Sequence, residues 1–125
     1  MKISGTVKHG SRIGRGLGYP TANIHAGDEV GAADGVYAAT AEYSCEKYGA
    51  MVNLGVKPTV SDNMERTLEI HLFGFEGDLY GKTISVELIE FVRPEQKFDS
   101  REKLRAQIEK DRQTIIEILK GRKCI

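Results

Sequence analysis

The residues from Gly10 to Asn23 are of types that could hold a nucleotide phosphate. This stretch places four glycines and two arginines within 14 residues and ends in Pro-Thr-Ala-Asn. Glycine permits positive φ and a close backbone approach, so amides can point at an anion, and guanidinium groups add donors that suit phosphate oxygens. Thr21 and Asn23 offer neutral oxygens of the kind that Mg²⁺ accepts. These residue types together indicate a nucleotide phosphate with its metal ion.

Two common phosphate-binding motifs do not fit this stretch. A Walker A loop needs a glycine, four residues and then Gly-Lys-Ser/Thr, and the chain has no such run. The glycines follow a GxGxG spacing, and Pro20 disfavours the helix that must follow a dinucleotide-binding turn. Glycine content alone fits an ordinary flexible surface loop equally well. The arginines and Pro-Thr-Ala-Asn favour a ligand site, and both interpretations stay open at this point.

Glu69 is the candidate general base. It lies in the segment 67–73, where polar residues alternate with Leu68, Ile70 and Leu72, so it must face away from a core that those leucines and isoleucine fill. A carboxylate on a rigid strand suits removal of a proton from an alcohol that attacks a phosphoryl group. The simpler interpretation is a solvated strand glutamate. His71 shares its face and could orient it or contact substrate, although a surface imidazole is the simpler interpretation here too.

Two further residues could contact a ligand from the next turn and strand. Tyr80 stands beside a glycine and could stack on a flat ring. Arg93 precedes a proline and could either hold an anion or close one end of a barrel. Either residue alone is more often structural than functional.

The elements that must position these residues are mostly short strands. Strands are expected at residues 3–8, 35–43, 50–55, 67–73 and 83–92, with connecting segments at 10–34, 46–49 and 57–66. Residues 35–55 resemble a hairpin whose turn is 46–49. The alternation in 83–92 changes phase at Ile89 and Phe91, which predicts a bulge or a barrel corner.

The last quarter of the chain has the period of a helix. An apolar stripe runs through Leu104, Ile108, Ile115 and Leu119, and Asp111 interrupts it. Asp99 with Glu102 resembles a capping box, and Lys120 with Gly121 suits the helix end. Several antiparallel strands followed by one helix predict a mainly β fold, a small barrel with a terminal helix packed on it.

Length and composition limit the classes of protein that fit. The 125 residues suit one domain over 1–125, and the 18 basic and 18 acidic residues balance, which argues against a broad basic nucleic-acid surface. Cys45 and Cys124 lack any metal-binding spacing and fit a reducing compartment. No run approaches the length of a membrane span. We therefore expect a cytoplasmic monomer with neither nucleic acid nor membrane as a partner.

The combined motifs resemble those of the ATP-dependent riboflavin kinases. The similar segments occur in the family's order and span nearly the entire chain; they include Gly14-Arg15, Leu17-Gly-Tyr-Pro-Thr-Ala-Asn-Ile24, Asn53-Leu-Gly55, Glu69-Ile-His-Leu72, Asp78-Leu-Tyr-Gly-Lys82 and Arg93-Pro-Glu95. The resemblance implies a closed six-stranded antiparallel Greek-key barrel with a C-terminal α-helix. It also implies transfer of the γ-phosphate of ATP to the terminal ribityl hydroxyl of riboflavin, which gives FMN.

The resemblance also implies roles for individual residues. Thr21 and Asn23 would contact Mg²⁺ and the nucleotide phosphates, and Glu69 would be the catalytic base. The ATP loop would include Gly10, Gly14 and Arg15. The flavin side would include Tyr80, Arg93 and, as a weaker apolar neighbour, Leu72.

In most bacterial relatives this domain follows an adenylyltransferase domain. The chain has no His-x-Gly-His nucleotidyl-transfer motif, so FAD synthesis is not expected from it. It fits either a stand-alone kinase or a domain of a larger protein. The alternative function is a flavin- or nucleotide-binding regulatory module with little turnover, and intact Thr21, Asn23 and Glu69 argue against it. A purely structural barrel would leave the placement of these polar residues unexplained.

Overall fold

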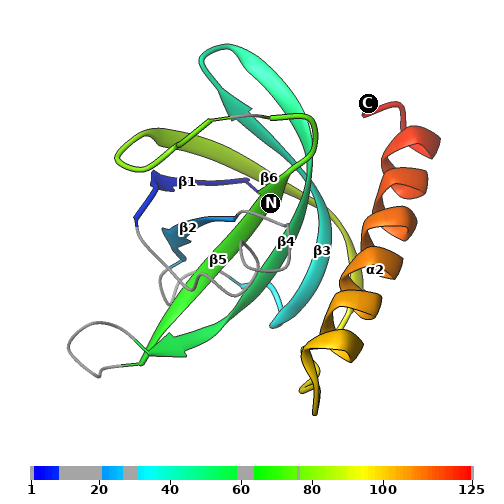
Figure 1. The fold of residues 1–125 in the computed structure, drawn as a ribbon. Coiled ribbons are helices and arrows are strands. Elements are labelled where there is room, and N and C mark those ends of the chain that lie inside the picture. The colour runs from blue at the N-terminus through cyan, green and yellow to red at the C-terminus, as the bar shows by residue number, and fades with distance from the viewer. Residues whose placement is uncertain (1, 9–20, 27–30, 59–63, 76, 125) are drawn as a thin grey trace.

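The computed structural model describes residues 2–8, 21–26, 31–58, 64–75 and 77–124. These ranges contain the strands β1 (Lys2–Thr6), β2 (Ala22–His25), β3 (Gly35–Tyr43), β4 (Glu46–Pro58), β5 (Met64–Leu72) and β6 (Thr83–Arg93), followed by the helix α2 (Arg101–Gly121). The helix runs along the outside of the sheet, beside β3 (Figure 1). Among the described residues, no helix is long and apolar enough to cross a membrane.

The six strands form one antiparallel sheet that curls into a nearly closed barrel. Their order is β1-β6-β3-β4-β5-β2, and β6 returns to pair with β3 after the consecutive strands β3, β4 and β5, which is a Greek key. Just beyond β1, the amide of Lys8 donates to the carbonyl of Asn23 in β2 at 2.8 Å. This isolated bridge brings the two edge strands together. The predicted mainly β barrel with a C-terminal helix is confirmed.

Two apolar clusters hold the domain together. The barrel interior is filled by alternate strand residues, among them the fully buried Ile24, Leu54, Leu68 and Ile70. The alternation predicted for 67–73 is thus confirmed. A smaller cluster joins Val36 and Ala38 on the outer face of β3 to Ile115 and Leu119 of α2. The helix therefore covers part of the outer face, and the rest of that face stays available for a site.

Three local expectations were wrong. The hairpin turns at Ser44 and Cys45, which have φ of 53° and 66°, as in two-residue turns that match strand twist, so residues 46–49 belong to β4. Long-range pairing with β5 also extends β4 to Pro58, into the expected polar connection 57–66. Residues 22–25, placed in a long loop by their sequence, form β2 because they pair with β5.

The phase change predicted in the last strand is confirmed as a break in its register with β3. The pairing skips Val92, between Phe91 and Arg93, and skips Ile89, between Leu88 and Glu90. Bulges bend a strand and re-aim its side chains. Here they lie at the end of β6 that carries Arg93 and leads to the helix.

The helix begins one residue later than the expected capping box. Its N-cap is Ser100, whose Oγ accepts a hydrogen bond from the amide of Lys103 at 3.1 Å. Asp99 instead forms an exposed ion pair with the side chain of Lys103, also at 3.1 Å. The helix ends at Gly121, as its sequence predicted.

The Ser100 cap leads to a stability prediction. Ser100→Ala should lower the free energy of unfolding by about 1 kcal/mol, because it leaves the amide of Lys103 without its acceptor at the helix start. Urea unfolding followed by circular dichroism would measure the change. Ser100→Asp keeps an acceptor and should unfold close to the parent protein. Equal losses in both variants would contradict the assigned cap.

Candidate functional site

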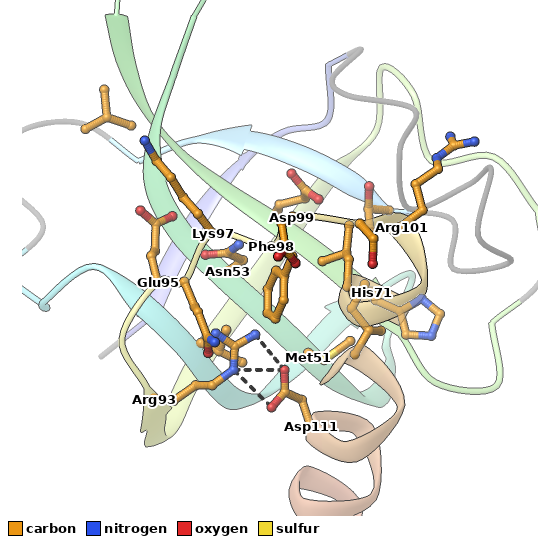
Figure 2. A pocket seen from close by; sticks show the side chains of 18 residues that line it. Met51, Asn53, His71, Arg93, Glu95, Lys97, Phe98, Asp99, Arg101 and Asp111 are labelled. Carbon is orange, nitrogen blue, oxygen red and sulfur yellow. Dashed lines mark hydrogen bonds and ion pairs between the residues drawn. The ribbon is translucent and has the colours of Figure 1, made fainter. Parts of the chain in front are cut away.

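A cavity of about 790 Å³ lies on the outer face of the barrel, beside the covering helix. Its floor is the outer face of β3, β4 and β5. Its opposite wall is the segment 94–100, here called the strap, together with the first turns of α2. Polar residues that line the cavity include Thr21, Asn53, Glu69, His71, Arg93 and Asp111 (Figure 2).

One row of paired residues crosses the sheet at this cavity. From β2 to β6 the row reads Asn23, Glu69, Asn53, Val36 and Arg93. Residues directly opposite each other in antiparallel strands share a face, and the sequence neighbours of Asn23, Glu69 and Asn53 fill the barrel interior. The row is therefore on the outer face. Four of its members line the cavity, namely Glu69, Asn53, Val36 and Arg93, whereas Asn23 does not.

Glu69 faces the cavity from β5, as the alternation predicted. It is half-buried, whereas its neighbours Leu68 and Ile70 are fully buried in the barrel. Thr21, which immediately precedes β2, lines the same cavity. Asn23 lies directly opposite Glu69 and is buried, with 4% of its surface exposed. Thr21 and Glu69 therefore share the cavity, whereas Asn23 is paired with Glu69 in the sheet but does not line the cavity.

Arg93 forms a buried ion pair with Asp111 of the helix. Its Nε donates to both carboxylate oxygens at 3.1 Å, and its Nη2 donates to Oδ2 at 2.8 Å. Gln107 adds a hydrogen bond from Nε2 to Oδ1 at 2.9 Å. The Asp111 side chain is 4% exposed and that of Arg93 is 19% exposed. The residue that interrupted the apolar stripe of the helix is therefore the partner of Arg93.

Arg93 also holds the strap in place. Its Nη1 donates to the carbonyl of Pro94 at 3.1 Å, and its guanidinium carbon lies 5.9 Å from the centre of the Phe98 ring. Figure 2 shows the Arg93 fork against Asp111, with Phe98 nearby. These contacts join β6 to the helix and to the strap, and the two roles predicted for Arg93, holding an anion or closing a barrel end, stay predictions.

The Glu95 side chain of the strap lies against the backbone of β4. A Cβ atom added to Gly55 would clash with the Glu95 carboxylate, which is the far end of a flexible side chain and could move aside. Gly55 therefore leaves room for this carboxylate over the sheet.

The structure places other predicted residues outside the cavity. Leu72 faces the barrel interior, where it packs in the core, so its side chain does not line the site. Tyr80 is 52% exposed in the turn before β6 and does not line the cavity either. This turn is bound to the residue that follows β1, because the amide of Gly81 donates to the carbonyl of Val7 at 2.9 Å. Gly10, Gly14 and Arg15 lie outside the described residues.

Sequence reasoning assigned no site role to three residues that the structure places there, although all three lie in segments that resemble the family. Asn53 stands between the buried Val52 and Leu54, so alternation alone would have put it on the face of Glu69. Asp111 carried a signal, because a charge within an apolar stripe calls for a partner. Phe98 belongs to Lys97-Phe98, which resembles the family, but nothing in the strap sequence shows that the strap crosses the sheet.

The donors at this site that suit a metal ion are hydroxyl and amide oxygens, not a cluster of carboxylates. Within the described ranges, no group of three or more His, Cys, Asp and Glu residues could hold a metal ion. Hydroxyl and amide oxygens can also bind a metal ion. The Thr21 hydroxyl and the Asn23 amide oxygen are hard oxygen ligands of the type that Mg²⁺ takes.

Comparison with known proteins gives consistent similarities. The family model Flavokinase, described as riboflavin kinase, matches residues 1–119. The chain is 46% identical over 109 residues to the RNA-binding riboflavin kinase RibR of Bacillus subtilis (strain 168), covering 87% of this chain and 47% of that protein. It is 41% identical over 114 residues to a bifunctional riboflavin kinase/FMN adenylyltransferase of Haemophilus influenzae, covering 90% of this chain and 37% of that protein.

A solved structure shares the fold. The crystal structure of riboflavin kinase from Trypanosoma brucei matches with a TM-score of 0.68 and 25% identity, covering 95% of this chain and 79% of that one. The chain spans less than half of the length of the two curated relatives above.

Proposed function

Because the matching family model covers residues 1–119, the chain belongs to the riboflavin kinase family, and we propose that it phosphorylates riboflavin with ATP. The observation that carries this proposal is the row that crosses the outer face of the sheet. It sets Glu69 between Asn23 and Asn53 at the edge of a cavity of about 790 Å³. A cavity of this size fits the range usual for small-molecule sites.

The proposed reaction needs one base and well-placed phosphates. Glu69 accepts the proton of the terminal ribityl hydroxyl while that oxygen forms a bond to the γ-phosphorus of ATP. The bond from this phosphorus to the bridging oxygen breaks, and ADP leaves. Such transfers depend mainly on positioning and charge neutralisation, so a glutamate needs no further relay. Because Glu69 is on a strand paired on both sides, its carboxylate is held by a rigid element.

Thr21 and Asn23 would hold the Mg²⁺ ion and the nucleotide phosphates. Both offer neutral oxygens; Thr21 lines the cavity, and Asn23 is paired directly with Glu69 in the sheet. The ion would neutralise charge on the phosphates when bound. Gly10, Gly14 and Arg15 would form the rest of the phosphate loop. The flavin would occupy the cavity beneath the strap, with Arg93 in its wall; the packing of Leu72 and the position of Tyr80 give those two residues no contact there.

Asn23→Leu should weaken the response to Mg²⁺. Leucine has the branched shape of asparagine, although it is larger, and it removes the oxygen, while the main-chain bond to Lys8 that closes the barrel remains possible. We expect the Mg²⁺ concentration for half-maximal rate to rise about tenfold, the effect of losing roughly 1.4 kcal/mol. Initial rates across a Mg²⁺ titration would measure it. An unchanged Mg²⁺ dependence in a protein that melts normally would refute this role.

Direct assay of the product tests the proposed function. The chain is incubated with riboflavin, ATP and Mg²⁺, and flavins are separated by liquid chromatography. The proposal expects FMN and ADP in equal amounts, and neither without riboflavin. Flavin binding without FMN would instead identify a regulatory module.

A further inference from the structure

The side chain of Asn53 carries a buried oxygen that lacks a partner. Its Oδ1 is shielded from solvent and accepts no hydrogen bond within the described part of the chain. Buried polar atoms are nearly always paired, so each exception calls for an explanation. Asn53 lines the cavity on the β4 side, opposite the strap (Figure 2). A ligand in the cavity is therefore the natural source of the missing donor.

The position of Asn53 in the row indicates what kind of donor it meets. On one side its directly paired neighbour is Glu69, and on the other side it is Val36. The Cβ atoms of directly paired residues lie about 4.5–5.5 Å apart. A chain that brings one hydroxyl to the Glu69 carboxylate therefore brings its next hydroxyl within reach of Asn53.

The rest of the cavity suits the remainder of such a ligand. Beside Asn53 the floor has an apolar patch made of Val36 of β3 and Met51 of β4, and Phe98 lines the cavity from the strap. The Arg93–Asp111 ion pair also lines the cavity, where it meets the helix. A molecule with a hydroxylated chain on a flat ring system would place its ring on the apolar patch and its chain toward Glu69.

We propose that Asn53 determines specificity by accepting a hydrogen bond, at Oδ1, from the ribityl hydroxyl next to the one that Glu69 deprotonates. This inference rests on the proposed function, since it takes riboflavin as the substrate. A site with a buried acceptor rejects analogues that lack the matching hydroxyl, because the acceptor then stays unpaired.

The test compares two isosteric variants and two flavins. Asn53→Val removes the acceptor, and Asn53→Thr has the same shape as valine but keeps an oxygen. The ligands are riboflavin and lumiflavin, which carries a methyl group in place of the ribityl chain. Dissociation constants are measured from flavin fluorescence, and thermal melting checks that both variants fold.

We expect Asn53→Val to weaken riboflavin binding about tenfold and to leave lumiflavin binding within about twofold of the parent. Asn53→Thr should bind riboflavin more tightly than Asn53→Val. Equal weakening of both flavins by Asn53→Val would overturn the proposal, because it would show a structural role. Unchanged riboflavin binding in that variant would overturn it too.

The failure of this inference can be told apart from failure of the proposed function. FMN formation is measured on the parent protein in parallel. FMN formed by the parent, with riboflavin binding insensitive to Asn53→Val, overturns only the role of Asn53. Selective loss of riboflavin binding with no FMN formed by the parent supports the contact and refutes the kinase activity.

Discussion

Glu69→Gln should lower turnover about 10²–10⁴-fold, the range usual for loss of a positioned general base. Glutamine keeps the size and hydrogen-bonding capacity of the side chain but cannot accept the proton of the attacking hydroxyl. The dissociation constants of ATP and riboflavin should change less than about threefold, since the base acts in the transition state. FMN formation gives the turnover number, and flavin fluorescence and calorimetry give the affinities.

A strand glutamate far from the cavity provides the control. Glu42 lies on β3 near the hairpin turn, is exposed and does not line the site. Glu42→Gln should keep parental turnover. If Glu69→Gln lost turnover and nucleotide affinity in equal measure, Glu69 would be a binding residue and not the base.

Asp111→Ala should be strongly destabilising and should weaken flavin binding. Removing one partner of a buried ion pair leaves the other charge uncompensated, which costs about 3–5 kcal/mol. We expect about 3 kcal/mol, because the Arg93 side chain keeps 19% of its surface exposed to water. A domain of this size has about 5–15 kcal/mol of stability, so the variant should fold but melt well below the parent. Urea unfolding measures the loss.

The effect on flavin binding follows from the strap. Asp111 holds the fork of Arg93, and Arg93 bonds the carbonyl of Pro94 and contacts Phe98. Once the Arg93 guanidinium is released from Asp111, the strap should move away from its place over the cavity. The KM for riboflavin should then rise more than turnover falls, because the strap forms a wall of the proposed flavin site.

A second ion pair between β6 and the helix serves as the matched control. Arg122 and Glu90 lie 2.6 Å apart, but both side chains are largely exposed. Arg122→Ala should cost at most about 1 kcal/mol, as exposed pairs do, and should leave the KM for riboflavin unchanged. Similar losses in Asp111→Ala and Arg122→Ala would contradict the role given to the buried pair.

Local patterns in the sequence were enough to predict the barrel, the helix and the orientation of Glu69. Alternation of Leu68 and Ile70 with polar residues determines which face Glu69 occupies, and this needs no knowledge of the neighbouring strands. The bulged strand was likewise visible as a change of phase at Ile89. Each of these features arises within one segment.

Features that depend on pairing between distant segments could not be predicted. The register that sets Asn53 opposite Glu69 joins residues 50–58 of β4 to the whole of β5, and the same pairing takes Pro58 into a strand. The partnership of Arg93 with Asp111 requires the helix to pack on the outer face. No local rule assigns that face, so the strap and the cavity beneath it became visible only in three dimensions.

A crystal structure with riboflavin, ADP and Mg²⁺ is the most direct test of the central claim, that riboflavin is phosphorylated in the cavity under the strap. We expect the ring system between the strap and the outer face of β3 and β4, with the terminal ribityl oxygen about 2.6–3.2 Å from the Glu69 carboxylate. A flavin bound elsewhere on the barrel, such as beside Tyr80, or a terminal hydroxyl out of reach of Glu69, would contradict it.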